Sequence, residues 1–288
     1  MDLRQYGALA KQAVDAWSDD YAPSMGAALS YYTLFSIAPL LLIVIAIAGM
    51  AFGDQAARGE IFAQLNGLIG AEGAAAVEKL LQHADQNDGQ GLIAAVTGVL
   101  VTLLGATAVF GELQNALDRI WRAPQAKQSG LWKLLRSRLL SFGMILGIAF
   151  LLMVSLVMSA VVSALGKLWG SAFDVILSFA MSTLLFAMIY KFMPRVRIGW
   201  GDVWIGAAVT ALLFAVGKFL IGLYIGKSSV ASAFGAAGSL VVLMVWVYYS
   251  AQIFLLGAEF TRLYAYAHGS RAGSRAPAAA PPSRIGPP

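Results

Sequence analysis

The feature that most constrains this chain is a series of long apolar stretches with almost no charge. A transmembrane helix needs about 20 consecutive apolar residues. Six candidate spans lie at 27–50, 91–111, 139–165, 172–193, 203–225 and 236–260. Because 59% of the chain is hydrophobic and only 12% is charged, a water-soluble fold could not cover its apolar surface. The sequence therefore predicts an all-α integral membrane protein, a bundle of six transmembrane helices.

Two of these spans, the fourth and the fifth, are interrupted by charge. Asp174 and Lys191 shorten the fourth, and Lys218 interrupts the fifth. Merging or losing one of them would place the two termini on opposite sides of the membrane. The distribution of Lys and Arg decides between these topologies, because basic loops stay in the cytoplasm.

The basic residues divide unevenly when the N-terminus is assigned to the cytoplasm. Fifteen of the 20 Lys and Arg then lie inside: Arg4, Lys11, Arg119, Arg122, Lys127, Lys133, Arg136, Arg138, Lys191, Arg195, Arg197, Arg262, Arg271, Arg275 and Arg284. The remainder are Arg58, Lys79, Lys167, Lys218 and Lys227. This asymmetry predicts six spans with both termini cytoplasmic.

Three further segments flank or interrupt the transmembrane domain, which we assign to residues 25–265. Residues 1–24 predict a helix on the membrane surface, with an apolar face of Leu3, Tyr6, Ala10, Ala13, Val14 and Trp17. The external segment 51–90 contains two amphipathic stretches, at 61–69 and 77–84, which we expect to cap the outer face. Residues 266–288, rich in Pro, Ala and Arg, predict a disordered tail.

The second span continues as an amphipathic helix over 112–122. Its apolar face consists of Leu113, Ala116, Leu117, Ile120 and Trp121. On the polar face, Asp118 and Arg122 stand four residues apart and are predicted to pair.

The first span carries a proline and an unusual number of hydroxyl groups. Pro39 removes a backbone donor near the middle of the span, so we expect the helix to kink or break there. The half before it holds Ser30, Tyr31, Tyr32, Thr33 and Ser36. These groups either line a substrate path or simply bond to neighbouring helices and to their own backbone.

Lys218 is the most informative charged residue within the predicted spans. A charge within the membrane is costly unless it is paired, hydrated or able to reach the interface. If the helix enters the membrane at Val203, Lys218 is about 22 Å deep and suits an anionic substrate. If the helix enters near Ile198, Lys218 reaches the outer headgroups and only snorkels.

A second group of polar candidates lies at the cytoplasmic ends of spans: Glu112, Asn115, Glu259 and Arg262. Glu259 and Arg262 are spaced to pair at i,i+3. Small-residue pairs such as Gly222 with Gly226 predict close helix packing, either within one bundle or in a homo-oligomer.

The sequence offers no equipment for catalysis. It contains no cysteine, and its two histidines, His83 and His268, fall in segments too far apart to share a site. We find no metal-ligand spacing, nucleophile–base pair or phosphate-binding glycine turn, so we expect no enzyme, no metal and no cofactor. Because orientation explains the basic loops, the expected partners are the lipid bilayer and anionic lipid headgroups, with no nucleic acid.

Four ordered motifs resemble a known family. They are AAALSYYTLFSIAPLL at 27–42, FGELQNALDRIW at 110–121, IYKFMPRVRIGWGDVWIGA at 189–207 and GSLVVLMVWVYYSAQIFLLGAEF at 238–260. Together they resemble the YihY/BrkB family of bacterial inner-membrane proteins over about residues 15–265. One departure is the loop SAFGAAGSL, which lacks the tyrosine expected near its glycines in many relatives.

The resemblance implies a multi-pass protein of the bacterial inner membrane, of a family labelled as transporters or virulence factors and once as a ribonuclease. Our leading hypothesis is a transporter or flippase-like protein for an anionic or lipid-derived substrate. The alternative is a non-transporting membrane scaffold for envelope organisation. A ribonuclease is a remote third, because the cytoplasmic loops offer only scattered carboxylates.

Overall fold

The structure is a computed structural model that describes residues 3–85, 108–124, 170–227, 234 and 238–273. All regular structure in these residues is α-helical, which confirms the predicted helical class. The helices are α1 (Leu3–Asp19), α2 (Ala22–Phe52), α3 (Asp54–Asp85), α6 (Gly170–Phe192), α7 (Trp200–Lys227) and α9 (Gly238–Ala267). A further helix covers 108–120. Most of the predicted span 91–111 and all of 139–165 lie outside the described residues.

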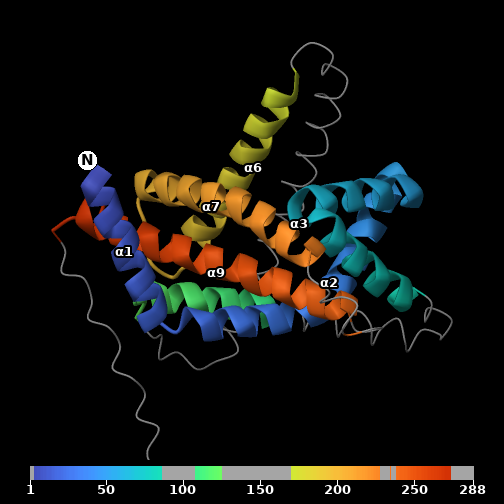
Figure 1. The fold of residues 1–288 in the computed structure, drawn as a ribbon, viewed down its shortest axis with the longest axis horizontal. Coiled ribbons are helices and arrows are strands. Elements are labelled where there is room, and N and C mark those ends of the chain that lie inside the picture. Colours follow the sequence, from blue (N-terminus) through green and yellow to red (C-terminus); the bar gives the residue numbers. More distant parts are fainter. Residues whose placement is uncertain (1–2, 86–107, 125–169, 228–233, 235–237, 274–288) are drawn as a thin grey trace, which may run out of the picture.

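Two of the described helices are long and apolar enough to cross a membrane. They are Trp200–Ile225 within α7 and Leu240–Ala267 within α9, while Ser178–Phe192 in α6 is apolar but shorter. Figure 1 places the start of α1 beside the end of α9. The six-span topology and the side on which each terminus lies stay predictions.

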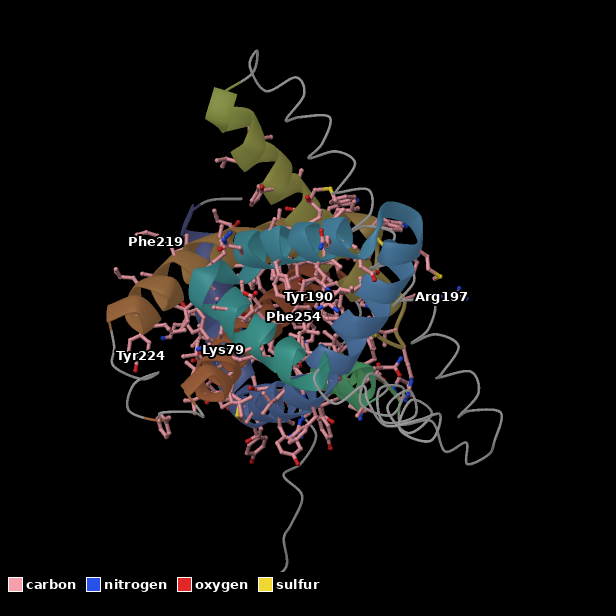
Figure 2. All side chains as sticks on the ribbon, turned by 90° about the vertical axis from the view of Figure 1, so that its right-hand side faces the viewer. Lys79, Tyr190, Arg197, Phe219, Tyr224 and Phe254 are labelled. Atoms are coloured by element: carbon pink, nitrogen blue, oxygen red, sulfur yellow. The ribbon has the colours of Figure 1, made fainter. Side chains whose placement is uncertain are left out.

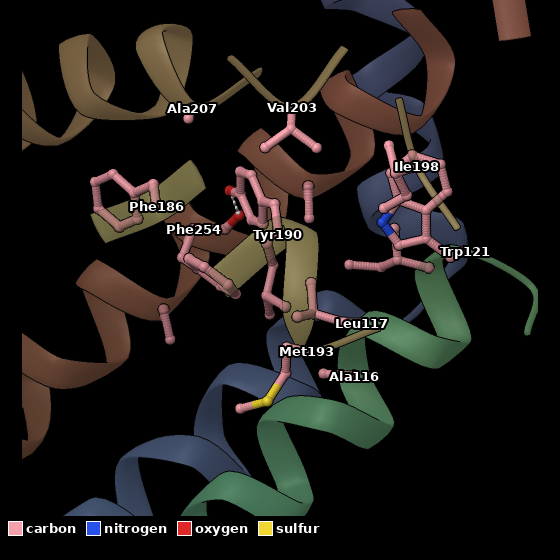
Figure 3. Close-up of a cluster of buried hydrophobic side chains, with 14 of the residues drawn as sticks. Ala116, Leu117, Trp121, Phe186, Tyr190, Met193, Ile198, Val203, Ala207 and Phe254 are labelled. Carbon is pink, nitrogen blue, oxygen red and sulfur yellow. Dashed lines mark hydrogen bonds between the residues drawn. The ribbon is translucent and has the colours of Figure 1, made fainter. Parts of the chain in front are cut away.

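Helix α9 is the centre of the described bundle, because α1, α2, α3 and α7 all pack against it (Figure 1). The main core forms where α6, α7, α9 and the 108–120 helix meet. There Leu117, Tyr190, Val203 and Leu255 are completely buried, and Figure 3 shows the side chains converging. Leu113 packs against this core, and Ala116, Ile120 and Trp121 are buried in it, which confirms the apolar face predicted for this helix.

One tyrosine ties three elements of this core together. The hydroxyl of Tyr190 on α6 donates to the carbonyl oxygen of Phe254 on α9 at 2.7 Å. The same hydroxyl lies 3.1 Å from the hydroxyl of Thr210 on α7. A buried hydroxyl with partners on two other helices fixes how those helices are placed.

Helix α2 decides between the two outcomes predicted at Pro39, a kink or a break. The helix is continuous across position 39, so the structure excludes a break. Its ribbon changes direction along its length, as a kink at Pro39 predicts (Figure 1). A proline that lacks one backbone bond can bend a helix whose neighbours hold both halves.

The segments next to α2 also differ in detail from expectation. Residues 54–85 form one helix, α3, and apolar side chains of both predicted amphipathic stretches pack with Ile45 of α2 and Leu243 of α9. In α1 the packed face is Leu9 and Ala13 against Phe260 of α9, whereas Val14 is exposed. The predicted α1 face is therefore right for Ala13 and for Trp17, which packs against the main core, and wrong for Ala10 and Val14, which are exposed.

Candidate functional site

Four buried charged residues meet at one end of the bundle, and we call them the ionic cluster: Asp20, Arg122, Glu259 and Arg262. Arg122 Nη1 lies 2.5 Å from Asp20 Oδ1, and Arg262 Nη2 lies 2.7 Å from Glu259 Oε2. Asp20 also acts electrostatically on Glu259, so the two pairs lie close together and are treated as one group. The pairing of Glu259 with Arg262 was predicted and is confirmed.

The ionic cluster joins three parts of the chain that are far apart in sequence. Asp20 stands in the turn between α1 and α2, Arg122 follows the 108–120 helix, and the other two belong to α9. None of the four side chains is more than 11% exposed. Buried charges are stable only when paired, and removing one partner of such a pair typically costs about 3–5 kcal/mol.

The backbone is unusual at the same place. Among the described residues, the only two non-glycine residues with positive φ are Tyr21, at 59°, and Arg122, at 51°. Each belongs to the ionic cluster or adjoins it, and the guanidinium of Arg119 stacks over the Tyr21 ring at 5.1 Å. A left-handed residue that is not glycine costs about 1–2 kcal/mol, and such strain tends to gather at functional sites.

Several buried polar atoms around the cluster have no hydrogen-bond partner within the described part of the chain. The donors are Nε of Arg122, Nε of Arg262 and the indole N–H groups of Trp17 and Trp121. The acceptors are Asp20 Oδ2 and Glu259 Oε1, while Glu259 Oε2 has only its ion-pair contact with Arg262. Buried polar groups are normally satisfied, so this concentration of unused donors marks a place able to bind a polar group.

A line of polar groups continues from the cluster along the interface between α2 and α9. About two turns of α9 before Glu259, the buried amide of Gln252 lies against Gly26 of α2. This amide has no hydrogen-bond partner among the described residues. Farther along, the Ser30 hydroxyl donates to the Met244 carbonyl at 2.8 Å. From residue 259 to residue 244, an α-helix rises about 22 Å.

The other hydroxyls predicted on this helix do not join that line. Tyr31 and Tyr32 are exposed and meet edge to face with their ring centroids 5.6 Å apart. Ser36 is buried but donates to the Thr33 carbonyl within its own helix at 3.3 Å. The side chain of Pro39 lies outside the described residues.

Lys218 lies on α7 and is exposed. Its neighbour Phe219, labelled in Figure 2, is also exposed, whereas Gly217 packs against Tyr249 and Ile253 of α9. The structure thus places Ser30 on the α2–α9 interface and Lys218 on another helix. A role for Lys218 in a substrate path stays a prediction.

The polar end of the 108–120 helix makes different pairs from those expected. Asp118 accepts a hydrogen bond from the Arg195 backbone N–H at 2.7 Å and pairs with its guanidinium at 3.4 Å. The predicted pair of Asp118 with Arg122 is therefore wrong. Burial raises the pKa of Asp118, while the Arg195 N–H and charge act in the opposite direction. Of the remaining candidates, Glu112 is half-buried and Asn115 is exposed.

Three residues of the site were not among the candidates from the sequence: Asp20, Arg122 and Gln252. Asp20 stands just before the first span, where acidic residues are common and uninformative. Gln252 had a clearer signal, because it is a polar residue inside a span and lies seven residues before Glu259, on the same helix face.

No group of three or more His, Cys, Asp or Glu side chains within the described ranges is arranged to hold a metal ion. The charged residues of the site instead form matched pairs, and the unused groups include both N–H donors and oxygen acceptors. The arginine and indole N–H groups among them suit an anion such as a phosphate or carboxylate.

Comparison with known proteins identifies the family. The family model described as virulence factor BrkB matches residues 13–282, nearly the whole chain. The chain belongs to the virulence factor BrkB family. This membership confirms the resemblance drawn from the four sequence motifs, and the second and fourth of those motifs contain or adjoin three residues of the ionic cluster.

Several similar proteins carry the name UPF0761 membrane protein. One from Ralstonia nicotianae is 28% identical over 266 residues, covering 89% of this chain and 59% of that protein. One from Rhodospirillum centenum is 30% identical, covering 87% and 56%, and one from Tolumonas auensis is 28% identical, covering 84% and 80%. The chain thus spans somewhat under three fifths of the first two relatives. No solved structure matches it.

Proposed function

We propose that this BrkB-family membrane protein carries an anionic, lipid-derived substrate across the bilayer along the α2–α9 interface. The observation that carries the proposal is the ionic cluster, with its unused N–H donors at one end of a polar line. Membrane-embedded charges are expensive, and where they occur they commonly mark the path of a substrate or ion.

The chemistry of the ionic cluster favours an anion. Arginine guanidinium groups can bind phosphate and carboxylate through two parallel N–H bonds. Here Asp20 and Glu259 each contact one terminal nitrogen of an arginine, and the Nε atom of each arginine stays without a partner among the described residues. A substrate phosphate that takes the place of one of these carboxylates keeps the guanidinium paired. The displaced carboxylate must then leave the buried cluster or take up a proton, because a buried charge without its partner costs about 3–5 kcal/mol.

The polar line supplies the continuation of this path. The Gln252 amide offers both a donor and an acceptor against the small residue Gly26, and Ser30 holds the Met244 carbonyl at 2.8 Å. These groups stand on an interface that is otherwise lined by apolar residues such as Met25 and Leu29. A headgroup moving along it would meet a polar side chain about every two helical turns.

A transport assay tests the proposal. Purified protein is reconstituted into vesicles with fluorescent phosphatidylglycerol, and the accessible label is quenched with dithionite. We expect the protein to move the lipid faster than protein-free vesicles do, and Arg262→Gln to abolish the gain. Arg195→Gln, which removes an arginine of an exposed ion pair, is the matched control and should retain activity. No movement with wild-type protein would refute the proposal.

The alternative function, a membrane scaffold, has an observation in its favour too. Helices α7 and α9 pack through glycine and threonine at very short range, which suits a rigid bundle. Because the chain contains no cysteine, single cysteines at Ser30, Gln252 or Lys218 can be tested in the purified protein with a hydrophilic thiol reagent, with exposed Arg197→Cys as control. Labelling at 30 and 252 supports a path, whereas labelling only at 197 favours the scaffold.

A further inference from the structure

We infer that the turn between α6 and α7 binds the phosphate of an anionic phospholipid on the outside of the bundle, with its acyl chains along α7. The site consists of Lys191, Phe192, Arg197, Trp200 and Trp204, and we call it the α6–α7 lipid site. It is separate from the α2–α9 path, and it would hold a resident lipid rather than transported cargo.

The cationic part of the site is fixed in place by the backbone. Lys191 donates to the Ile198 carbonyl, and its ammonium lies 4.9 Å from the centroid of the Trp200 ring. Arg197 is exposed, and its own carbonyl accepts a hydrogen bond from Arg271 at 3.0 Å. Lys191, in the last turn of α6, and Arg197, shortly before α7, therefore flank one short turn whose carbonyl oxygens at Arg197 and Ile198 are both hydrogen-bonded.

The charges of this turn are available to a ligand. Among the described residues, no carboxylate forms an ion pair with Lys191 or Arg197. The nearby acids are already occupied, since Asp118 binds Arg195 and Asp202 accepts from the Ser270 hydroxyl at 2.5 Å. The neighbourhood of the turn holds two carboxylates, Asp118 and Asp202. It holds four cations, which leaves an excess of positive charge: Lys191, Arg195, Arg197 and Arg271. That excess complements a phosphate diester.

The apolar part begins directly beside these cations. Phe192 and Trp200 are 57% and 49% exposed, and their ring centroids lie 6.0 Å apart. One turn along α7, Trp204 is 44% exposed, and the exposed face continues through Leu212 and Val216. Exposed tryptophans beside basic residues are typical of the membrane interface, where one end of the ring is apolar and the other is hydrated.

These two parts together match the shape of a phospholipid better than that of a soluble anion. A free phosphate needs only the cations, whereas a phospholipid also covers the exposed rings and the aliphatic face of α7. The ammonium of Lys191 can turn from the Ile198 carbonyl to a lipid phosphate while it stays over the Trp200 ring, which adds a cation–π contribution.

Native mass spectrometry of the purified protein, with phosphatidylglycerol and phosphatidylcholine added in turn, tests the inference. We expect phosphatidylglycerol to be retained selectively, and the double variant Lys191→Gln with Arg197→Gln to lose about 10-fold in affinity, equivalent to about 1.4 kcal/mol. Trp200→Ala, which keeps both cations, should weaken retention as well. Inorganic phosphate at millimolar concentration should not compete.

A charge-matched control distinguishes lipid binding at the α6–α7 lipid site from general electrostatic attraction between the lipid and the protein. Lys11→Gln with Lys79→Gln removes two exposed cations from α1 and α3 and should leave lipid retention unchanged. The thermal unfolding temperature of each variant shows that it is folded. Equal retention of both lipids by wild-type protein, equal losses in the two double variants, or full competition by phosphate would each overturn the inference. The result of this test does not depend on the result of the transport assay.

Discussion

Gly206 of α7 lies directly against Thr261 of α9, so close that a Cβ atom on Gly206 would stand 2.7 Å from Thr261 Cβ. The contact is reciprocal, because Gly257 of α9 lies against Thr210 of α7 in the same way. Each threonine hydroxyl donates to the glycine carbonyl four residues earlier in its own helix, at 2.7 Å and 2.6 Å. With their hydroxyls satisfied internally, the two helices can approach through their smallest residues.

Gly206→Ala should therefore destabilise the protein by about 1–3 kcal/mol, because the added methyl group overpacks the α7–α9 contact. Gly222→Ala on the same helix is the control, since no atom lies within 4 Å of a Cβ placed there. Alanine is a better helix former than glycine, so this variant should be neutral or slightly stabilised. Thermal unfolding in detergent measures both. Similar losses in the two variants would contradict the close contact.

Arg122→Gln should cost about 3–5 kcal/mol, because it leaves the buried Asp20 carboxylate without its guanidinium. Adding Asp20→Asn should recover much of the loss, since the double variant buries no unpaired charge. Arg195→Gln, in a pair whose arginine is 38% exposed, should cost about 1 kcal/mol or less. Denaturation of the four proteins under one condition gives the comparison. Failure of Asp20→Asn to restore stability would mean that the two charges act independently.

The sequence predicted those features that depend on local spacing. Uncharged runs placed α2, α6, α7 and α9, and the three-residue separation of Glu259 and Arg262 predicted their pair. Local spacing could not predict contacts between distant segments. Asp20 and Arg122 are 102 residues apart, and Asp118 and Arg195 are 77 residues apart.

The error over Asp118 has a local physical cause. The i,i+4 rule assumes that both residues are helical, but Arg122 has φ at 51° and has left the helix. Its side chain therefore points to the α1–α2 turn instead of back along its own helix.

Glycine spacing was likewise insufficient by itself. The pair of Gly222 with Gly226 was singled out, yet a Cβ at Gly222 would meet open space. Gly206 with Thr210 and Gly257 with Thr261 have the same four-residue spacing and form the real contact. Spacing identifies a small face, but only packing against the neighbouring helix decides which small face is used.

Tyr190→Phe should lower the stability by about 1 kcal/mol, because it removes the hydroxyl that donates to the Phe254 carbonyl while keeping the ring in the core. Thr210 keeps its bond to the Gly206 carbonyl, so no donor there is left unsatisfied. Tyr31→Phe, at an exposed ring, is the matched control and should change little. The unfolding temperatures of the two variants decide the matter, and equal shifts would argue against a linking role for Tyr190.

Asp118 makes the stability depend on pH. Its folded-state pKa is raised above the ordinary value of 3.8, mainly by burial, so the folded protein binds the proton more tightly than the unfolded chain does. The resulting stabilisation is complete below the ordinary value and is lost as the pH rises through the raised one. Asp118→Asn removes this titration. The unfolding temperature of the variant, relative to wild type, should therefore increase between about pH 4 and about pH 7. A difference that stays constant or falls over this range would mean that the ion pair with Arg195 outweighs burial.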